Sequence, residues 1–168
     1  MGASPFLVSV TELVKHPGTR RPTEVAGPIE GLAITSARVP AGADVAFVGV
    51  LESIADGSIT ATGAVRAPWA GECRRCLAEM AGELVTDVRE VFARDGFDGE
   101  TYPLDRDRVE LLPMVHDAVL LALPLAPLCD GDCAGPDPEA HPVAVAAADV
   151  PANRGDPRWA GLSDLRFD

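Results

Sequence analysis

Two runs of β-branched side chains that flank an Asp-Gly step place the strongest constraint on the fold. The runs cover Val45–Ile54 and Ile59–Trp69, and Asp56-Gly57 lies between them. Asp-Gly is typical of a two-residue hairpin, because both central residues of a type I′ turn need positive φ. Apolar residues alternate again over residues 84–92, and residues 29–39 make a plausible fourth strand. The pattern predicts an antiparallel meander, which can curl towards a barrel.

A single helix is predicted over residues 111–123. Only His116 and Asp117 are polar inside this segment, so the helix should be mostly buried against the sheet. Pro113 falls in its first turn, where a missing N–H costs nothing, and Pro124 ends it. We therefore expect an α+β fold in which one buried helix packs on an antiparallel β-sheet.

The C-terminal part of the chain has a different composition. Residues 134–156 are rich in Ala, Pro and Asp and show no periodicity, which is typical of a flexible linker. Residues 157–168 contain Trp159 and two leucines at helical spacing, which predicts a short docked helix. The expected organisation is an α+β domain over residues 1–133 followed by this flexible C-terminal segment.

Two further segments are predicted as loops. Residues 95–110 are rich in acidic side chains, but the order of their oxygen ligands does not fit an EF-hand. Near the start of the chain Lys15, His16, Arg20 and Arg21 cluster with no acid between them. This cluster is either an ordinary solvated loop or a contact for phosphate.

The charge balance limits the classes of partner. The chain has 168 residues with 14 basic and 26 acidic side chains, a net charge of −12. This argues against DNA and against coating long nucleic acids, because phosphate contacts need many Lys and Arg. A basic protein, or RNA met at a local basic spot, is compatible. The longest nearly apolar stretch, Ala118–Leu128, is shorter than the ~20 residues that span a bilayer. With no secretory signal at the start, we expect a cytoplasmic protein without a membrane partner.

The four cysteines form two close pairs. Cys73 and Cys76 flank two arginines between predicted strands, and Cys129 and Cys133 follow the predicted helix directly. Two such thiolate pairs can complete a closed tetrahedral zinc site, which is structural because no position stays open for water. A site of this kind would pin the sheet to the helix, and His141 is a further candidate ligand.

Other interpretations of the cysteines stay open at this point. They can be ordinary buried thiols, or Cys73 and Cys76 can belong to a thiol redox protein. A redox C-x-x-C normally opens a helix in a βαβ unit, whereas this one lies between strands. The sequence contains no Gly-rich phosphate loop, no nucleophile elbow and no H-E-x-x-H. We therefore expect a protein that is not an enzyme.

Several motifs occur in an order that is shared with a known family. They are Glu72-Cys-Arg-Arg-Cys-Leu77, the helical segment 110–124 that ends in Leu-Ala-Leu-Pro, Pro127-Leu-Cys129 with Cys133, and Asp156-Pro-Arg-Trp159. Together they resemble the YceD family, whose members are described as large ribosomal RNA subunit accumulation proteins. The opening residues 10–18 resemble those of its actinobacterial members.

The resemblance implies a non-enzymatic factor that supports large-subunit (23S) ribosomal RNA accumulation and ribosome biogenesis. It would bind an RNA precursor or a basic ribosomal protein. Arg74 and Arg75 are the candidate contacts, with Arg20 and Arg21 as helpers. A zinc-stabilised acidic adaptor for a basic protein is the alternative. Some relatives carry His near the second Cys pair, which favours metal, but residues 135–141 lack the further G-L-C-x-x-C-G of many relatives.

Overall fold

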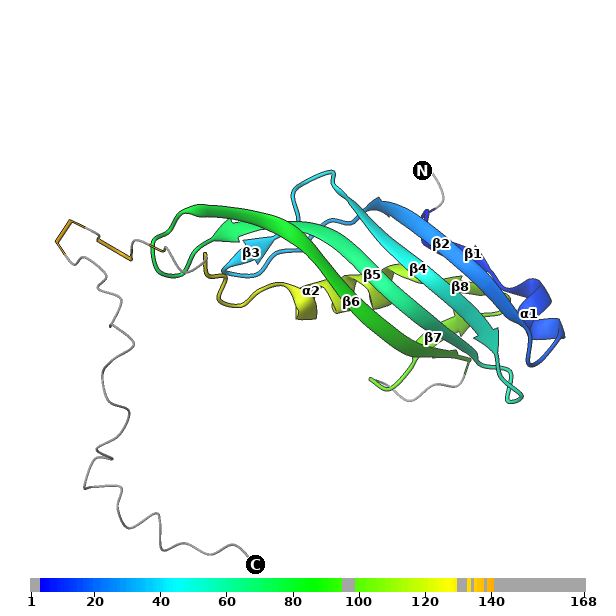
Figure 1. Cartoon of the computed structure of the whole chain (residues 1–168). Coiled ribbons are helices and arrows are strands. Elements are labelled where there is room, and N and C mark those ends of the chain that lie inside the picture. The colour runs from blue at the N-terminus through cyan, green and yellow to red at the C-terminus, as the bar shows by residue number, and fades with distance from the viewer. Residues whose placement is uncertain (1–3, 95–98, 130–132, 134, 138, 141–168) are drawn as a thin grey trace, which may run out of the picture.

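The computed structural model describes residues 4–94, 99–129, 133, 135–137 and 139–140. Most of them form one curled sheet with a main helix against it (Figure 1). The predicted linker 134–156 and the predicted helix 157–168 lie almost entirely outside this part, so both stay predictions. In chain order the elements are β1 Leu7–Ser9, α1 Thr11–Lys15, β2 Arg20–Pro28, β3 Ala37–Arg38, β4 Asp44–Ser53, β5 Ile59–Glu72, β6 Glu79–Ala93, β7 Tyr102–Asp105, β8 Arg108–Glu110 and α2 Leu112–Ala122.

The sheet is mixed, which corrects the expectation of a purely antiparallel one. Its strand order is β1-β8-β7-β6-β5-β4-β2, and the two-residue strand β3 also pairs with β5. Among the described strands every pairing is antiparallel except β6 with β7, where Phe92 lies opposite Tyr102 in a parallel register. β7 therefore runs in the same direction as the end of β6, with Ala93 opposite Pro103 as the second pair.

The predicted meander forms the centre of the sheet. β4 pairs with β5 up to Ser53 opposite Ile59, and β5 pairs with β6 along its whole length. The turn between β4 and β5 is not of type I′, because only Gly57 has a positive φ, of 85°. Asp56 instead accepts hydrogen bonds at Oδ1 from the backbone N (2.8 Å) and the hydroxyl (2.6 Å) of Ser58. The Asp side chain therefore closes the loop in place of a second residue with positive φ.

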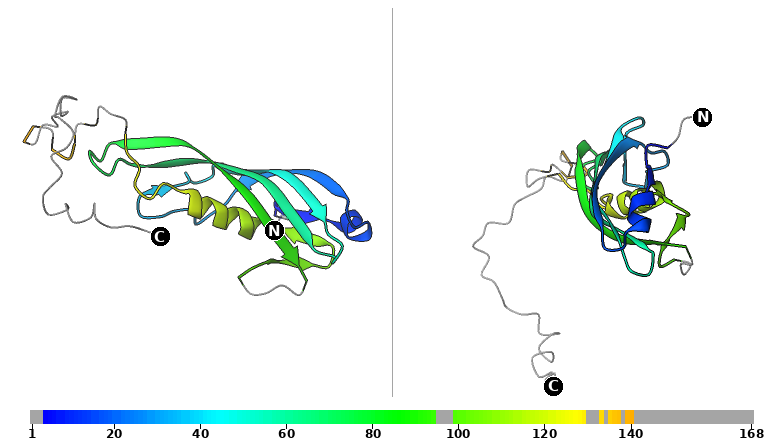
Figure 2. Two further views of the ribbon diagram at one scale, coloured as in Figure 1. Left: turned by 60° about the horizontal axis from the view of Figure 1, so that its bottom comes forward. Right: turned by 90° about the vertical axis from the view of Figure 1, so that its right-hand side faces the viewer.

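The predicted helix is confirmed as α2, one residue shorter at each end. It lies inside the curl of the sheet, which wraps around it as a half-barrel when viewed end-on (Figure 2). Met114, Val115 and Val119 face the sheet and are buried, whereas Leu121 points away and is 88% exposed. The largest fully buried side chains around them include Phe6, Phe47, Leu51, Ile59, Phe92, Leu111 and Leu123. Among the described residues no helix is long and apolar enough to cross a membrane.

Only the two arginines of the basic cluster near the start of the chain lie in a strand rather than in the predicted loop. Arg20 and Arg21 begin β2, which is the last strand at one edge of the sheet. Pro22 and Pro28 lack an N–H and are therefore tolerated at such an edge. Arg20 Nε lies 3.2 Å from the carboxylate of Glu52 on the neighbouring strand. The prolines and the polar residues interrupt the alternation of apolar and polar side chains that would predict this strand.

Two other predicted segments also differ in the structure. The predicted loop over residues 95–110 contains β7 and β8, joined by a turn in which Arg106 has a φ of 52°. The predicted strand over residues 29–39 supplies only β3 and a bridge between Ala33 and Arg38. β7 and β8 are too short to show an alternation of apolar and polar residues. The segment before β3 does not continue as a strand, because the chain turns at Gly31, which has a positive φ of 79°.

Candidate metal centre

The hairpin of β5 and β6 carries the first cysteine pair at its tip. The two strands pair as far as Glu72 opposite Glu79, and residues 73–78, here called the knuckle, connect them. Two backbone hydrogen bonds of Cys73 close the knuckle. The Cys73 N donates to Ala78 O (2.9 Å), and the Cys73 O accepts from Leu77 N (2.9 Å). Leu77 adopts a φ of 60°, a conformation that turns the chain back into β6. The sequence prediction of a Cys pair between two strands is therefore confirmed.

The second pair reaches the knuckle because α2 ends at its base. Beyond the helix the chain runs along the knuckle, where Pro127 O accepts a hydrogen bond from Arg74 N (2.9 Å). Two residues later, Cys129 N donates to Cys73 Sγ (3.4 Å). Arg75 Nη2 adds a contact to Cys129 O (3.4 Å). These bonds bring the two cysteine pairs together although Cys73 and Cys129 are 56 positions apart in the sequence.

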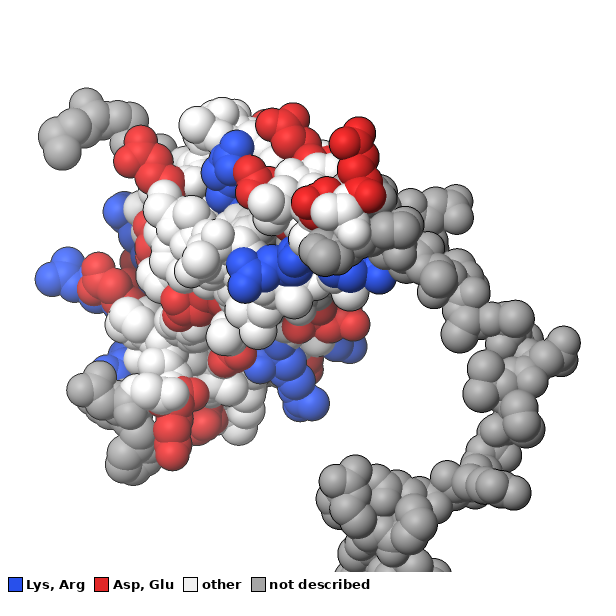
Figure 3. All heavy atoms as spheres, turned by 90° about the vertical axis from the view of Figure 1, so that its left-hand side faces the viewer, with Lys and Arg blue, Asp and Glu red and all other residues white. Residues whose placement is uncertain are grey.

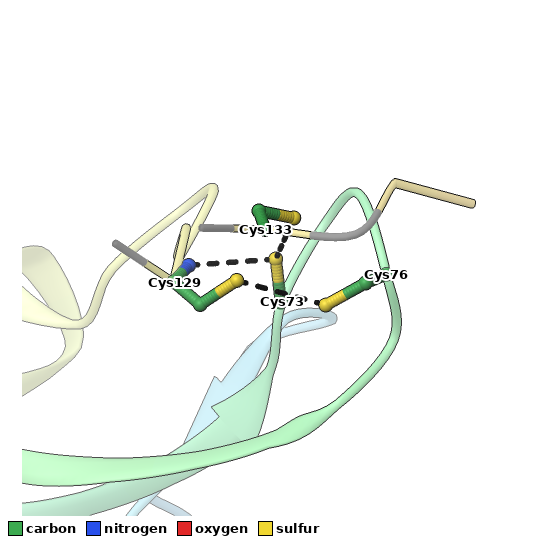
Figure 4. A group of neighbouring side chains, drawn as sticks. All are labelled: Cys73, Cys76, Cys129 and Cys133. Carbon is green, nitrogen blue, oxygen red and sulfur yellow. Dashed lines mark hydrogen bonds between the residues drawn. The ribbon is translucent and has the colours of Figure 1, made fainter. Parts of the chain in front are cut away.

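The four sulfur atoms converge on one point (Figure 4). Cys73 Sγ and Cys133 Sγ are 3.9 Å apart, Cys76 Sγ and Cys129 Sγ are 3.6 Å apart, and all four lie within 4.8 Å of one another. A tetrahedral metal with metal–sulfur bonds of about 2.3 Å holds its sulfurs about 3.8 Å apart. All four thiols are free. The cluster could therefore hold one metal ion, and His141 lies outside the described residues.

The electrostatics of the cluster suit a cation. Backbone N–H groups of Cys129, Cys76 and Arg75 lower the pKa of the Cys73 thiol to about 5, because they stabilise its thiolate. The other thiols, first that of Cys133, raise the pKa of Cys129 to about 12. Four thiolates in this space repel one another unless a cation lies between them, and coordination to a metal deprotonates a thiol. Cys73 and Cys133 are buried, whereas Cys76 and Cys129 are partly exposed.

The four arginines that the sequence singled out lie at two ends of the molecule. Arg74 and Arg75 are exposed on the knuckle. Arg20 and Arg21 lie at the other end of the sheet, where Arg20 is opposite Glu52 and Glu52 is opposite Thr60. From Thr60 to Glu72 strand β5 extends roughly 40 Å at ~3.4 Å per residue. The structure does not bring the two arginine pairs together.

The structure places a further arginine beside the knuckle that sequence reasoning missed. Arg38 belongs to β3, which pairs with β5 just before Cys73, with Arg38 opposite Ala70. Because β3 has only two residues, no periodic signal in the sequence could have linked Arg38 to a segment more than 30 positions away. Seen from this end, basic side chains lie among acidic ones on the surface (Figure 3).

Comparison with known proteins gives one family match. The family described as Large ribosomal RNA subunit accumulation protein YceD matches residues 61–166, a range that includes all four cysteines. An uncharacterized protein of Mycobacterium tuberculosis is 36% identical over 125 residues, which cover 68% of this chain and 58% of that protein. An uncharacterized protein of Mycobacterium bovis matches with the same figures. One of Mycobacterium leprae is 28% identical over an alignment that covers 96% of this chain and 78% of that protein. No solved structure matches the chain significantly.

Proposed function

Because this chain belongs to the YceD family of large ribosomal RNA subunit accumulation proteins, we propose that it supports accumulation of large-subunit (23S) ribosomal RNA, and so ribosome biogenesis, by binding RNA. It acts as a binding factor rather than an enzyme. The observation that carries the proposal is the exposure of Arg74 and Arg75 on a knuckle whose two flanking cysteines belong to a candidate metal centre. The family name supports the process, and the knuckle supplies a contact suited to phosphate.

Zinc is the metal that best suits the four-cysteine cluster. A set of four thiolates in a tetrahedral arrangement is typical of structural zinc, and it leaves no position for a catalytic water. Bound zinc would join the tip of the β5–β6 hairpin to the chain that follows α2. The thiol redox alternative has weaker support, because Cys73 and Cys76 lie on a hairpin tip and not at the start of a helix.

The knuckle arginines are well placed for phosphate. The backbone N of Arg74 donates a hydrogen bond to Pro127 O, and the Arg75 guanidinium contacts Cys129 O. These contacts fix the position of the loop that carries both side chains. A guanidinium is planar and can donate two hydrogen bonds to one phosphate. The same side chains also offset the negative charge of a zinc tetrathiolate. A test of RNA binding must therefore confirm that metal is retained.

The experiment reverses both charges in the variant Arg74→Glu with Arg75→Glu. Zinc content and the thermal transition are measured first, and the variant should keep both. It should then fail to co-sediment with large-subunit precursors and fail to restore ribosomal RNA levels in a deletion strain. Arg66→Glu with Arg89→Glu is the matched control, because both residues are exposed on the same hairpin away from the knuckle. If the knuckle variant binds and complements like the parent, RNA binding at the knuckle is refuted.

The net charge of −12 favours a second candidate function. In this alternative the chain is a zinc-stabilised adaptor whose acidic surface binds a basic ribosomal protein. Competitor RNA distinguishes the two functions, because it displaces the chain from an RNA target and spares a complex with a basic protein. The knuckle variant, which is more acidic than the parent, should bind a basic protein at least as well as the parent does.

A further inference from the structure

We propose that a pocket beside the knuckle, lined by Arg38 and Arg74, is a subsite for one phosphate group of the RNA backbone. This inference rests on the proposed function and adds a residue and a site to it. The pocket has a volume of about 230 Å³ and is formed by the segment before β3, by β3 itself and by the end of β5 with the knuckle. That volume is below the roughly 300–1,000 Å³ of pockets that enclose whole small molecules, and it suits a single charged group.

The pocket is held in shape by contacts from three segments. β3 pairs with β5 through Ala37 opposite Gly71. A Cβ at Gly71 would lie 2.4 Å from Ser36 O, so the loop can approach this closely only because position 71 is glycine. The Ser36 hydroxyl donates to Pro124 O (2.9 Å), at the end of α2. The wall that carries Arg38 is thus fixed to the hairpin on one side and to the segment leading to Cys129 on the other.

The groups that line the pocket are suited to an anion. Arg38 and Arg74 are both exposed, and among the described residues neither lies within 4.0 Å of a carboxylate. Neither positive charge is therefore neutralised by a direct ion pair with a carboxylate of the described residues. Thr35 adds an exposed hydroxyl to the lining. Two guanidiniums from different segments can donate to different oxygens of one phosphate, which gives both strength and orientation.

One carboxylate in the lining of the pocket would repel a phosphate, and this repulsion provides a second test of the proposal. Glu72 also lines the pocket, and it lies directly opposite Glu79 in the strand register. Like charges in such a pair destabilise a sheet, and Arg38, which lines a second pocket together with both glutamates, can lessen their repulsion. If Arg38 has only this role, its removal changes stability and leaves RNA binding unchanged. If it binds phosphate, removal of Arg38 and neutralisation of Glu72 change the RNA affinity in opposite directions.

The experiment measures binding of a short fluorescein-labelled single-stranded oligouridylate to the full chain by anisotropy over a range of salt. Arg38→Ala should bind about tenfold more weakly, the size expected for one lost charge-assisted contact. Its salt slope should be shallower by about 0.7, the value for one phosphate contact on a single strand. Glu72→Gln should bind more tightly than the parent. Arg66→Ala, an exposed arginine on the same hairpin outside the pocket, is the matched control and should change little.

Several outcomes overturn the proposal and separate it from the proposed function. If Arg38→Ala binds like the parent while the double knuckle variant loses binding, the pocket is refuted and RNA binding at the knuckle stands. If the parent does not bind the oligonucleotide, the pocket is refuted, and co-sedimentation with large-subunit precursors decides the proposed function separately. If Arg38→Ala has a lower Tm than the parent or loses zinc, the variant Arg38→Lys takes its place in the test. It keeps the positive charge and removes the planar guanidinium that can donate two hydrogen bonds to one phosphate. Parent-like affinity in both Arg38→Lys and Glu72→Gln refutes the pocket.

Discussion

At the scale of single residues, Cys73 is the centre of the four-cysteine cluster. It is buried, its sulfur accepts a hydrogen bond from Cys129 N, and it lies 3.9 Å from the sulfur of Cys133. Cys73→Ser should therefore abolish binding of about one equivalent of zinc and lower the free energy of unfolding by at least about 3 kcal/mol, because metal binding is coupled to folding. For a chain of this size that corresponds to a fall in Tm of roughly 6–12 °C.

Metal analysis and thermal melting check this prediction together. A chelator provides the control, since it should lower the Tm of the parent towards that of Cys73→Ser and leave the variant unchanged. A parent that carries no metal, melts identically with and without chelator and shows four freely titratable thiols would contradict it.

Tyr102 gives the described part of the chain a pH dependence at alkaline pH. Burial and the Asp117 carboxylate, which accepts a hydrogen bond from the Tyr102 hydroxyl (2.9 Å), raise the pKa of Tyr102 from 10.0 to about 12. Between these values the folded chain holds a proton that the unfolded chain has lost, so stability falls as pH rises through this window. The contribution is fully present below pH 10.

Tyr102→Phe should flatten this alkaline decline, while its ring still packs 5.4 Å from that of Phe92. Urea unfolding from about pH 9.5 to about pH 11.5 measures the slope. Asp117→Asn, which keeps the phenol and removes the charge, should give an intermediate slope. Parallel curves for parent and Tyr102→Phe would show that Tyr102 does not contribute.

The residues of the candidate site differ in how far the sequence predicts them. The pairing of the four cysteines is visible in the sequence, because each pair is local and both pairs flank predictable elements. The sequence does not predict that Arg38 lies beside the knuckle, because this position depends on a two-residue strand and on the close approach that Gly71 allows. The sequence also does not predict the distance between Arg20 and Arg74, because that distance depends on the length and register of β5.

At the scale of elements, α2 provides a test of the half-barrel core. Val119 is fully buried, whereas Leu121 on the opposite side of the same helix is 88% exposed. Val119→Asp places an unpaired charge in the core and should destabilise the chain by about 4 kcal/mol or more. Leu121→Asp makes the same kind of change in solvent and should stay within about 0.5 kcal/mol of the parent. Chemical denaturation of both variants measures the difference, and similar losses in the two would show that α2 is oriented otherwise.

The elements themselves were predictable where hydrophobic periodicity is long. The central strands and α2 each repeat their pattern over ten or more residues, and all are confirmed. The sequence does not predict β2, because two prolines and two basic residues interrupt its alternation, and an edge strand tolerates such prolines. The parallel placement of β7 could not be predicted, because it depends on packing against β6 and α2 rather than on any local signal.

At the scale of the whole molecule, the distance between the two arginine pairs sets a requirement on RNA length. Contact with both ends needs a ligand at least roughly 40 Å long, which is longer than a single phosphate subsite and its neighbours. Arg20→Ala with Arg21→Ala should therefore leave the affinity for a short oligonucleotide unchanged and weaken binding of a longer structured RNA. Binding curves for RNAs of increasing length check this. An equal loss for short and long RNAs would contradict this prediction, because it would show that a short RNA already depends on Arg20 and Arg21.

The separation of 56 positions between Cys73 and Cys129 also imposes an order on biosynthesis. A nascent chain that has exposed only the first pair offers two of four ligands, and the chain between the pairs includes β6, β7, β8 and α2. Closing a loop of this length has an entropic cost, and prior docking of α2 into the half-barrel removes most of it. If the cluster binds a metal ion, that ion would therefore be acquired last, after every intervening element is in place. Metal occupancy would then serve the cell as a maturation mark, since only a completely folded copy can carry it.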